Sequence, residues 1–230
     1  MDLYDVMRTT FAAREFTYEP VSDAVLARIL DNARFAPSGG NRQGWHVIVV
    51  REQATKKALA ALAEPAAKRY VAQQRAGESP WNSVEPTKVD AATIEATPAP
   101  RRLMEPFTKA PVILVVCVDL RVVASTDQLL NRVGVISGAS IYPFVWNILL
   151  VARNEGFGGT ITTFAVAEEP RLRALLGIPS YVAVAAIVPL GVPAQRLRRL
   201  SRKAVGEFAV RERWDGDALG PAPGSVCGCF

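Results

Sequence analysis

Three apolar runs restrict the folds that are open to this chain. They are WHVIVV (Trp45–Val50), VILVVCV (Val112–Val118) and YVAVAAIVPL (Tyr181–Leu190). Each is short, rich in β-branched residues and free of Lys, Arg, Asp and Glu, which is typical of strands buried inside a sheet. The segments between the runs are too long for hairpins and carry helical patterns. We therefore expect an α+β chain whose helices cover a central sheet.

Helical patterns lie before the first run and between the runs. The clearest begins at Ser22, a good N-cap, has Asp23 in its first turn and apolar residues on one face, and stops at Pro37. Further helices are expected over Lys56–Gln74, over Ala124–Asn154 with a kink at Pro143, and over the short EEPRLRALLGIP segment that starts at Glu168.

The sequence predicts one domain over residues 1–214 and a flexible tail over residues 215–230. Within the domain, the character changes over residues 55–108, whose second half is polar and carries several prolines. This region lacks enough periodic apolar residues for a core of its own. We therefore expect an insertion or lid rather than a second domain.

The net charge of +5 is concentrated near the C-terminus. Residues 191–214 hold seven Lys or Arg side chains against two Glu, so this segment alone accounts for the excess. A local basic segment suits a small anion or an acidic cofactor better than it suits a nucleic-acid duplex. We therefore expect no nucleic-acid partner.

One uncharged stretch, from Val133 to Ala152, is long enough to span a bilayer. Pro143, Asn147 and several Gly and Ser residues interrupt it, and no second such stretch is present. A helix that is apolar all round also suits the centre of a large soluble core. We expect no membrane span, and the N-terminus has no signal-peptide pattern, which favours a cytoplasmic location.

The cysteines and the histidine argue against a disulfide framework and against a zinc site. Cys117 lies inside an apolar run, Cys227 and Cys229 lie at the extreme C-terminus, and His46 is the only histidine. Because His46 stands in an apolar strand, we interpret it as a core or rim residue rather than a general base. No Gly-x-Ser-x-Gly, Walker or metalloprotease motif is present. An enzyme with this inventory takes its chemistry from an organic cofactor.

The segment APSGGNRQGW (Ala36–Trp45) is suited to holding a flavin. Small residues follow a helix end there, and the side chains of Ser38, Asn41 and Gln43 accompany free backbone N–H groups. Small residues let a flat ring approach the backbone, and amides bind its polar edge. A helix C-cap followed by an ordinary loop would explain PSGG alone.

Three other segments could converge on the same ligand. RTTFAAREF (Arg8–Phe16) and LSRK (Leu200–Lys203) supply Arg and Thr side chains, which bind phosphate through charge-assisted hydrogen bonds. GFGGTITTF (Gly156–Phe164) is a Gly-rich connection that could pass over a ring face. Each segment has a plainer alternative, because Arg side chains are common surface charges and Arg14 could form a structural ion pair.

In these blocks the chain resembles the nitroreductase family of FMN enzymes. The family pattern has a basic run ending Arg-x-Phe, then Pro-Val, a helix, and an Ala-Pro-Ser…Asn-x-Gln-x-Trp loop before an apolar strand. The corresponding residues here are Arg14-Glu15-Phe16, Pro20-Val21, Ala36-Pro37-Ser38, Asn41, Gln43 and Trp45, with NILLVARNEGFG, LLGIP and SRK following in the family's order. The likeness covers nearly the whole chain except about residues 55–108 and the C-terminal tail.

The resemblance implies a sandwich in which helices, one of them long and central, cover a mostly antiparallel sheet. It also implies an extensive homodimer with FMN at the interface, NADH or NADPH as electron donor, and a small organic acceptor. One departure concerns the phosphate, because Thr10-Phe11-Ala12 stands where many relatives carry Arg-Arg-Ser or Arg-His-Ser. By likeness, the FMN-binding residues would be Arg8, Thr10, Arg14, Pro37, Ser38, Gly39, Asn41, Gln43, Thr160, Thr162 and Arg202.

The expected reaction is ping-pong hydride transfer through the flavin N5 to an acceptor such as a nitroaromatic or a quinone. The same fold could instead serve dehalogenation, dehydrogenation of a natural product or flavin fragmentation. Two further alternatives are a flavin-binding protein without turnover and a module whose segment Arg196–Lys203 binds nucleic acid or an anionic membrane. Tyr70 and Trp81, in the insertion, are candidate lid residues that would select the acceptor.

Overall fold

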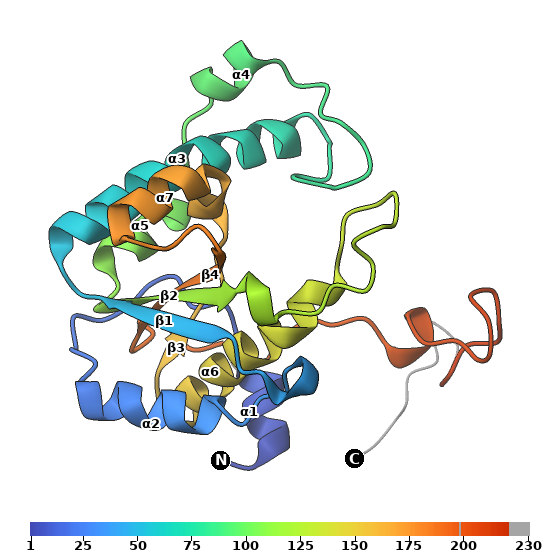
Figure 1. Cartoon of the computed structure of the whole chain (residues 1–230), viewed down its shortest axis with the longest axis horizontal. Helices are drawn as coiled ribbons and strands as arrows, with labels where there is room; N and C mark the ends of the chain where they lie inside the picture. The colour runs from blue at the N-terminus through green and yellow to red at the C-terminus, as the bar shows by residue number, and fades with distance from the viewer. Residues whose placement is uncertain (198, 221–230) are drawn as a thin grey trace. The chain divides into compact units, whose positions relative to one another are not determined.

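The computed structural model describes residues 1–197 and 199–220, so Cys227 and Cys229 lie outside the described part. At its centre is a four-stranded antiparallel sheet in the order β1-β2-β4-β3 (Figure 1). All three apolar runs are strands of this sheet, so the predicted α+β class is confirmed. The strands are β1 (Trp45–Val50), β2 (Val112–Asp119), β3 (Gly158–Gly159) and β4 (Val182–Gly191).

The position of β2 in the sheet explains why it is apolar throughout. It pairs on one side with β1, where Trp45 lies opposite Val118, and on the other with β4, where Val112 lies opposite Leu190. Every residue of β2 except the last is buried. Because helices cover both faces of the sheet, side chains on both faces of β2 enter a core, and a continuous apolar run is the result.

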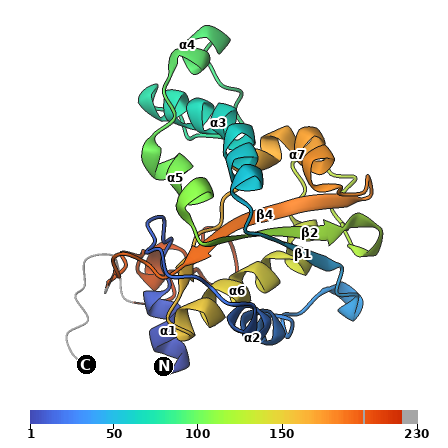
Figure 2. The same cartoon turned by 90° about the vertical axis from the view of Figure 1, so that its left-hand side faces the viewer.

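Helices lie on both sides of the sheet, as Figure 2 shows. The short helix α4 (Ala91–Ala96) is an exception, because it packs against α3 (Gln53–Arg75) and not against the sheet. One face carries α1 (Leu3–Thr9), α2 (Asp23–Ala33) and α6 (Tyr142–Asn154), and the other carries α3 (Gln53–Arg75), α5 (Arg101–Lys109) and α7 (Glu169–Leu176).

Each face has its own apolar core. On the α2 and α6 side, Ile29 and Ile148 are completely buried in a cluster with Leu114 of β2. On the other side, Leu59 of α3 and Phe107 of α5 are completely buried with alternate residues of β2. The two faces of one strand thus hold the two helical layers together through burial of apolar surface.

Local sequence rules explain where helices begin and end. Ser22 caps α2, as predicted, because its Oγ accepts a hydrogen bond from the backbone N–H of Val25 at 3.3 Å. Gly177 follows α7 with a φ of 67°, a left-handed conformation that glycine adopts without steric cost.

The helix expected over residues 124–154 is shorter than predicted. α6 begins only at Tyr142, with Pro143 in its first turn, and a 3-10 helix (Ile136–Ser140) precedes it. Pro143 therefore starts the helix rather than kinking it. The prediction was wrong for the first part of the segment because Asp127 binds backbone N–H groups in a non-helical loop, and such side-chain contacts compete with helix formation.

Asp127 organises this loop. Its buried carboxylate accepts hydrogen bonds from the backbone N–H groups of Val135 (2.8 Å) and Ile136 (3.4 Å), the hydroxyl of Ser125 and the guanidinium of Arg132. The backbone N–H of Val135 is the main cause that lowers the pKa of Asp127 to about 2, and it outweighs the opposite effect of burial.

Replacing Asp127 by Ala is expected to loosen the loop before α6 and leave the sheet intact. The substitution removes the acceptor of two backbone N–H groups, at about 1–3 kcal/mol for a buried donor. Hydrogen exchange should become faster at Val135 and Ile136. In the unmodified protein this contribution is fully present above the ordinary pKa of 3.8 and is lost as pH falls through about 2. Unchanged exchange at both amides would count against the role given to Asp127.

The region predicted as an insertion, residues 55–108, contains most of α3 together with α4 and α5. α3 and α5 contribute to the core on their side of the sheet. The connection between α3 and α4, residues 76–90, contains no buried residue. The lid role of this region stays a prediction.

The chain forms two compact units, Met1–Arg196 and Leu197–Phe230. The division predicted from the sequence, a domain over residues 1–214 followed by a flexible tail, stays a prediction. In its described part, the second unit contains a 3-10 helix (Val205–Glu207) and a bridge between Val210 and Ala218. Among residues 1–197 and 199–220, no helix has the length and apolar character needed to cross a membrane.

Candidate functional site

The N-terminal arm lies along the Gly-rich turn that follows α6. Ala12 forms a parallel bridge with Gly159, and the backbone N–H of Ala13 donates to the Gly159 carbonyl at 2.9 Å. This pairing brings Arg14 close to residues 160–164. Arg14 and these residues line a common hollow. Two of the segments selected from the sequence therefore meet in the structure.

Glycine is needed in this turn because other backbone passes close to it. A Cβ atom on Gly159 would lie 2.7 Å from the carbonyl oxygen of Pro189, and one on Gly158 would lie 2.7 Å from Cγ of Pro193. The strand backbone at Pro189 cannot rotate away as a flexible side chain could. The Gly-Gly pair thus holds the turn against β4 and fixes the position of Thr160.

The Arg14 hollow is a cavity of about 170 Å³ where the arm meets this turn. Thr160 is buried, and the backbone of Thr162 pairs with that of Ile187 in both directions at 2.9 Å. Arg14 is exposed, its guanidinium makes one long hydrogen bond (3.4 Å) to the Ala12 carbonyl, and no carboxylate pairs with it in the described part of the chain. The lining residues are Arg14, Tyr70, Leu103, Pro106 and residues 160–164.

Arg8 and Thr10 make other contacts. The guanidinium of Arg8 lies over the ring of Tyr4, 5.6 Å from its centroid. The hydroxyl of Thr10 is buried and donates to the Val6 carbonyl at 2.7 Å, at the end of α1. Neither residue lines the Arg14 hollow. Arg14 is therefore the residue of the predicted phosphate-binding arm that reaches it.

The loop over residues 37–43 has an unusual backbone. Gly40, Asn41 and Gln43 have positive φ values of 60°, 53° and 50°. Oγ of Ser38 accepts the backbone N–H of Gln43 at 2.9 Å, and the Gln43 side-chain amide donates to Oδ1 of Asn41 at 3.1 Å. Left-handed residues other than glycine are uncommon and cluster at functional sites. The structure thus brings together the three polar side chains selected from this loop.

The remaining predicted residues of the loop anchor and begin it. The backbone N–H of Gly39 donates to Oγ of Ser140 at 3.1 Å, which ties the loop to the segment before α6. Pro37 is exposed and opens the loop after α2.

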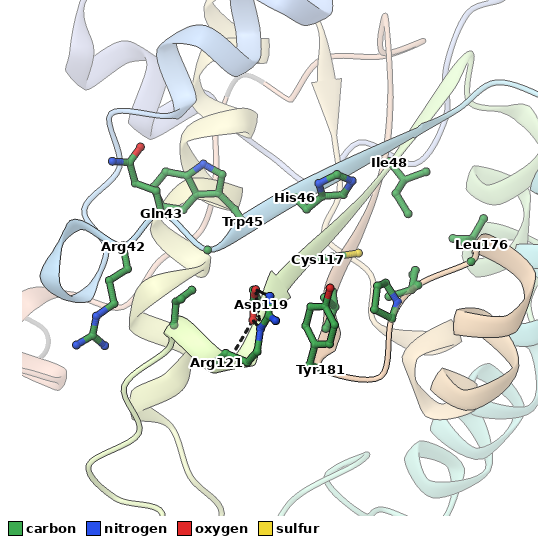
Figure 3. A pocket seen from close by; sticks show the side chains of 16 residues that line it. Arg42, Gln43, Trp45, His46, Ile48, Cys117, Asp119, Arg121, Leu176 and Tyr181 are labelled. Carbon is green, nitrogen blue, oxygen red and sulfur yellow. Dashed lines mark hydrogen bonds and ion pairs between the residues drawn. The ribbon is translucent and has the colours of Figure 1, made fainter.

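A larger hollow of about 640 Å³, the sheet-edge hollow, lies beside β1, with Gln43 at its margin (Figure 3). Asp119, the acidic residue that lines this hollow, forms an ion pair with Arg121 at 2.7 Å. The hydrogen bonds from Arg121 lower the pKa of Asp119. The same guanidinium lies 3.7 Å from the centroid of the Tyr181 ring. These groups satisfy one another, and Arg42 is the lining residue of this hollow whose guanidinium has no carboxylate partner in the described part of the chain.

The sheet-edge hollow also holds the side chains of His46 and Cys117. His46 is exposed, so of the two predicted alternatives, core or rim, it takes the rim position. Burial raises the pKa of the Cys117 thiol to about 11, so the thiol is protonated and a poor nucleophile at neutral pH. No cluster of three or more His, Cys, Asp or Glu residues suited to a metal ion occurs in the regions that the structure describes.

The Arg14 hollow and the sheet-edge hollow share no lining residue. The residues selected from the sequence therefore fall into two groups. Arg14, Thr160 and Thr162 line the Arg14 hollow, and Gln43 lines the sheet-edge hollow. Pockets for organic ligands typically have volumes of about 300–1,000 Å³. The Arg14 hollow is too small to enclose a flavin within a single chain.

Leu103 and Pro106, which also line the Arg14 hollow, were not among the residues predicted from the sequence, and Phe164 was only the last residue of the Gly-rich segment. Tyr70, selected only as a lid residue, lies among them and meets Phe164 edge-on, with 5.7 Å between ring centroids. Apolar residues at helical spacing are usually core residues, so the sequence held no signal that separated these from the core.

Comparison with known proteins decides the family. A family model described as "Nitroreductase family" matches residues 7–192. The chain belongs to the nitroreductase family. A relative from Thermus thermophilus named NADH dehydrogenase is 29% identical over 187 residues, which cover 79% of this chain and 82% of the relative. Iodotyrosine deiodinase 1 of Rattus norvegicus is 23% identical over 220 residues, which cover 91% of this chain and 69% of the deiodinase.

A solved structure confirms the fold expected of a nitroreductase. The crystal structure of an oxidized iodotyrosine deiodinase bound to FMN and 3-iodo-L-tyrosine is similar to this chain with a TM-score of 0.65 and 20% sequence identity. The match covers 92% of this chain and 99% of the deiodinase chain. The antiparallel sheet between two helical layers is therefore the nitroreductase fold.

Proposed function

We propose that this protein is an FMN-dependent oxidoreductase that takes a hydride from NADH or NADPH and passes electrons to a small organic acceptor. The Arg14 hollow carries the proposal. There a guanidinium without a carboxylate partner in the described residues stands beside Thr160 and Thr162, on a Gly-rich turn of a nitroreductase-family chain.

The residues of the hollow fit the phosphate and the ring of FMN. Arg14 has donors free for a phosphate, and charge-assisted hydrogen bonds of this kind are the stronger ones. Thr10 already donates its hydroxyl proton to Val6, so Arg14 takes the main role in the arm and Arg8 and Thr10 a smaller one. Arg202, in the second unit, is proposed as a further phosphate residue.

A second copy of the chain would complete the site. α6 exposes Tyr142 (45%) and Trp146 (41%), and the segment before it exposes Leu129 and Val133. Tyr142 and Trp146 lie one helical turn apart on α6, and exposed apolar side chains that gather on one face mark an interface. We propose a homodimer that covers these residues and in which the loop over residues 37–43 of one copy lies at the Arg14 hollow of the other. This arrangement would enclose a ligand that the hollow cannot enclose alone.

When bound, FMN would supply the redox chemistry, accepting a hydride from NAD(P)H and returning electrons to the acceptor. The protein's own residues would orient the reactants and exclude water. Arg14 would hold the phosphate end, Thr160 and Thr162 would contact the ring, and Phe164 would shield it. No proton shuttle is required of His46, which lies in the sheet-edge hollow. Because the electron donor is an intracellular nucleotide, we place the reaction in the cytoplasm.

Reductive dehalogenation is the second candidate reaction at the same site. Relatives named iodotyrosine deiodinase match 91% of the chain, which is more of it than the NADH dehydrogenase relative matches. The cofactor site would be the same and only the acceptor would differ. Dehydrogenation of a natural product and flavin fragmentation would use the same site.

The visible spectrum of the purified protein tests the proposal. We expect a bound oxidised flavin whose absorption bleaches on addition of NADPH or NADH and recovers when a quinone, a nitroaromatic or an iodophenol is added. A bound flavin that neither nicotinamide reduces would make the protein a flavin carrier without turnover. Failure to bind FMN would overturn the proposal.

A further inference from the structure

A second cavity, the Trp81 cavity, adjoins the Arg14 hollow. It has a volume of about 410 Å³. The two cavities share Tyr70, Thr163 and Phe164 as lining residues, so the edge-on pair of aromatic rings stands where they meet. Pro80 and Trp81, from the connection between α3 and α4, close the Trp81 cavity on another side. A molecule placed against a ligand in the Arg14 hollow could therefore extend into this cavity.

The walls of the Trp81 cavity carry no charge. None of its lining residues is Asp, Glu, Lys, Arg or His, and the side-chain polar groups are the Tyr70 phenol, the Thr163 hydroxyl and the Trp81 indole N–H. The indole N–H is already used, because Nε1 of Trp81 donates to the Ala66 carbonyl at 3.3 Å. A wall of this kind favours an uncharged aromatic ring, since burial of an unpaired ion is costly.

Trp81 is held in place by three contacts. Its backbone N–H donates to Oε1 of Gln73 at 3.1 Å, and Gln73 is itself completely buried and bonded to Glu78. Its indole donates to Ala66, and the guanidinium of Arg69 lies 4.2 Å from the centroid of its ring. These contacts fix both the backbone and the ring of one residue.

The backbone of Trp81 is strained, yet its side chain remains accessible. Its φ of 56° lies in the left-handed region, which is a genuine outlier for a bulky residue. The residue is nevertheless 42% exposed, so burial of the ring does not explain the strain. Strain of this kind persists where surrounding contacts impose it, and it clusters at ligand-binding sites.

We propose that the Trp81 cavity is the acceptor subsite and that Trp81 selects flat aromatic acceptors without ionic substituents. The inference rests on the proposed function, because the electrons reach the acceptor from NAD(P)H by way of FMN. A quinone bound there would become a hydroquinone by gaining two electrons and two protons, the hydride of NAD(P)H supplying both electrons and one proton, and solvent the other proton. The cavity would hold the ring and take no part in the proton transfer.

The cavity also distinguishes this protein's acceptor from an amino acid. The deiodinase relatives are named for iodotyrosine, whose ammonium and carboxylate groups both need partners when they leave water. No lining residue of the Trp81 cavity is charged, and the guanidinium of Arg69 stacks on the ring of Trp81 without lining the cavity. A phenol with the same iodinated ring but no amino-acid group therefore suits it better.

The test compares two ligands with the same ring on the FMN-loaded full-length protein in its oxidised state. Calorimetry measures Kd for 2-iodophenol and for 3-iodo-L-tyrosine in the wild type and in Trp81→Ala, Trp81→Phe and Val84→Ala. Val84 is the matched control, because it lies in the same connection, is 89% exposed and does not line the cavity. FMN content and reduction by NADPH are measured first for every variant.

The wild type should bind 2-iodophenol more tightly than 3-iodo-L-tyrosine. Trp81→Ala should weaken binding of 2-iodophenol about tenfold, Trp81→Phe should recover most of this loss, and Val84→Ala should change nothing. The proposal fails if flavin-loaded Trp81→Ala binds 2-iodophenol as well as the wild type does, or if iodotyrosine binds more tightly. If Trp81→Ala does not hold FMN, Trp81→Leu takes its place under the same criterion. A wild type that lacks FMN would instead refute the proposed function, so the two failures are distinguishable.

Discussion

Replacing Arg14 by Ala is expected to weaken FMN binding by about a hundredfold, because its hydrogen bonds to a phosphate are charge-assisted and each contributes about 1.5–3 kcal/mol. Arg14 has no ion-pair partner in the described residues, so its removal leaves no carboxylate unpaired. The loss of FMN affinity should therefore measure the contact between Arg14 and the FMN phosphate. Fluorescence titration of the flavin-free protein with FMN gives the dissociation constant, and the melting temperature with saturating FMN gives an independent measure.

Two further variants separate a specific contact from a general effect of charge. Arg14→Lys keeps the charge but loses the forked donor geometry, so it should fall between the wild type and Arg14→Ala. Arg75→Ala removes the same charge from an exposed position at the end of α3, outside both hollows, and should leave the FMN affinity unchanged. Equal losses for Arg75→Ala and Arg14→Ala would show that Arg14 has no special role.

Replacing Gly159 by Val is expected to destabilise the fold by more than about 3 kcal/mol, which lowers the melting temperature by about 6–12 °C for a chain of this size. A Cβ atom there would meet the Pro189 carbonyl oxygen at 2.7 Å and a methyl group of Leu149 at 3.1 Å. Rotation of a side chain cannot relieve a contact with backbone, so the turn must move away from β4. Because the turn also carries Thr160, FMN binding should fall as well.

Gly177→Ala is the matched control for this substitution. Gly177 also occupies a special position, with a φ of 67°, but a Cβ atom there would meet nothing within 4 Å. The variant should lose about 1 kcal/mol through backbone strain alone and keep its affinity for FMN. A Gly159→Val variant no less stable than Gly177→Ala would mean that the turn can shift away from β4 without loss.

The fold was predictable where the pattern was local. The apolar runs of β1, β2 and β4 and the cap at Ser22 follow from rules that act within a few residues. The start of α6 was not predictable in this way, because the carboxylate of Asp127 accepts hydrogen bonds from backbone N–H groups eight and nine residues further along the chain. Apolar composition across that segment favoured a helix, and one buried acid prevents it.

Two segments of the candidate site were predictable from their motifs, and their role in binding FMN stays a prediction. Arg14 and the Gly-rich turn with Thr160 were selected from separate segments, and the structure joins them through the pairing of the arm with Gly159. The role of Tyr70 and Phe164 as the boundary between two cavities depends on contacts between distant parts of the chain. A sequence shows such residues only as apolar positions, so their function follows from packing and not from pattern.

The FMN content of a mixed dimer tests the central claim, that each site joins the arm of one copy to the loop of the other. One copy carries Arg14→Ala and the other carries Asn41→Ala together with Gln43→Ala. Either homodimer should hold little FMN, because both of its sites lack a binding group. The mixed dimer has one site with an intact arm and an intact loop, so it should hold about half the FMN of the wild type. A mixed dimer as empty as its parents would contradict the account.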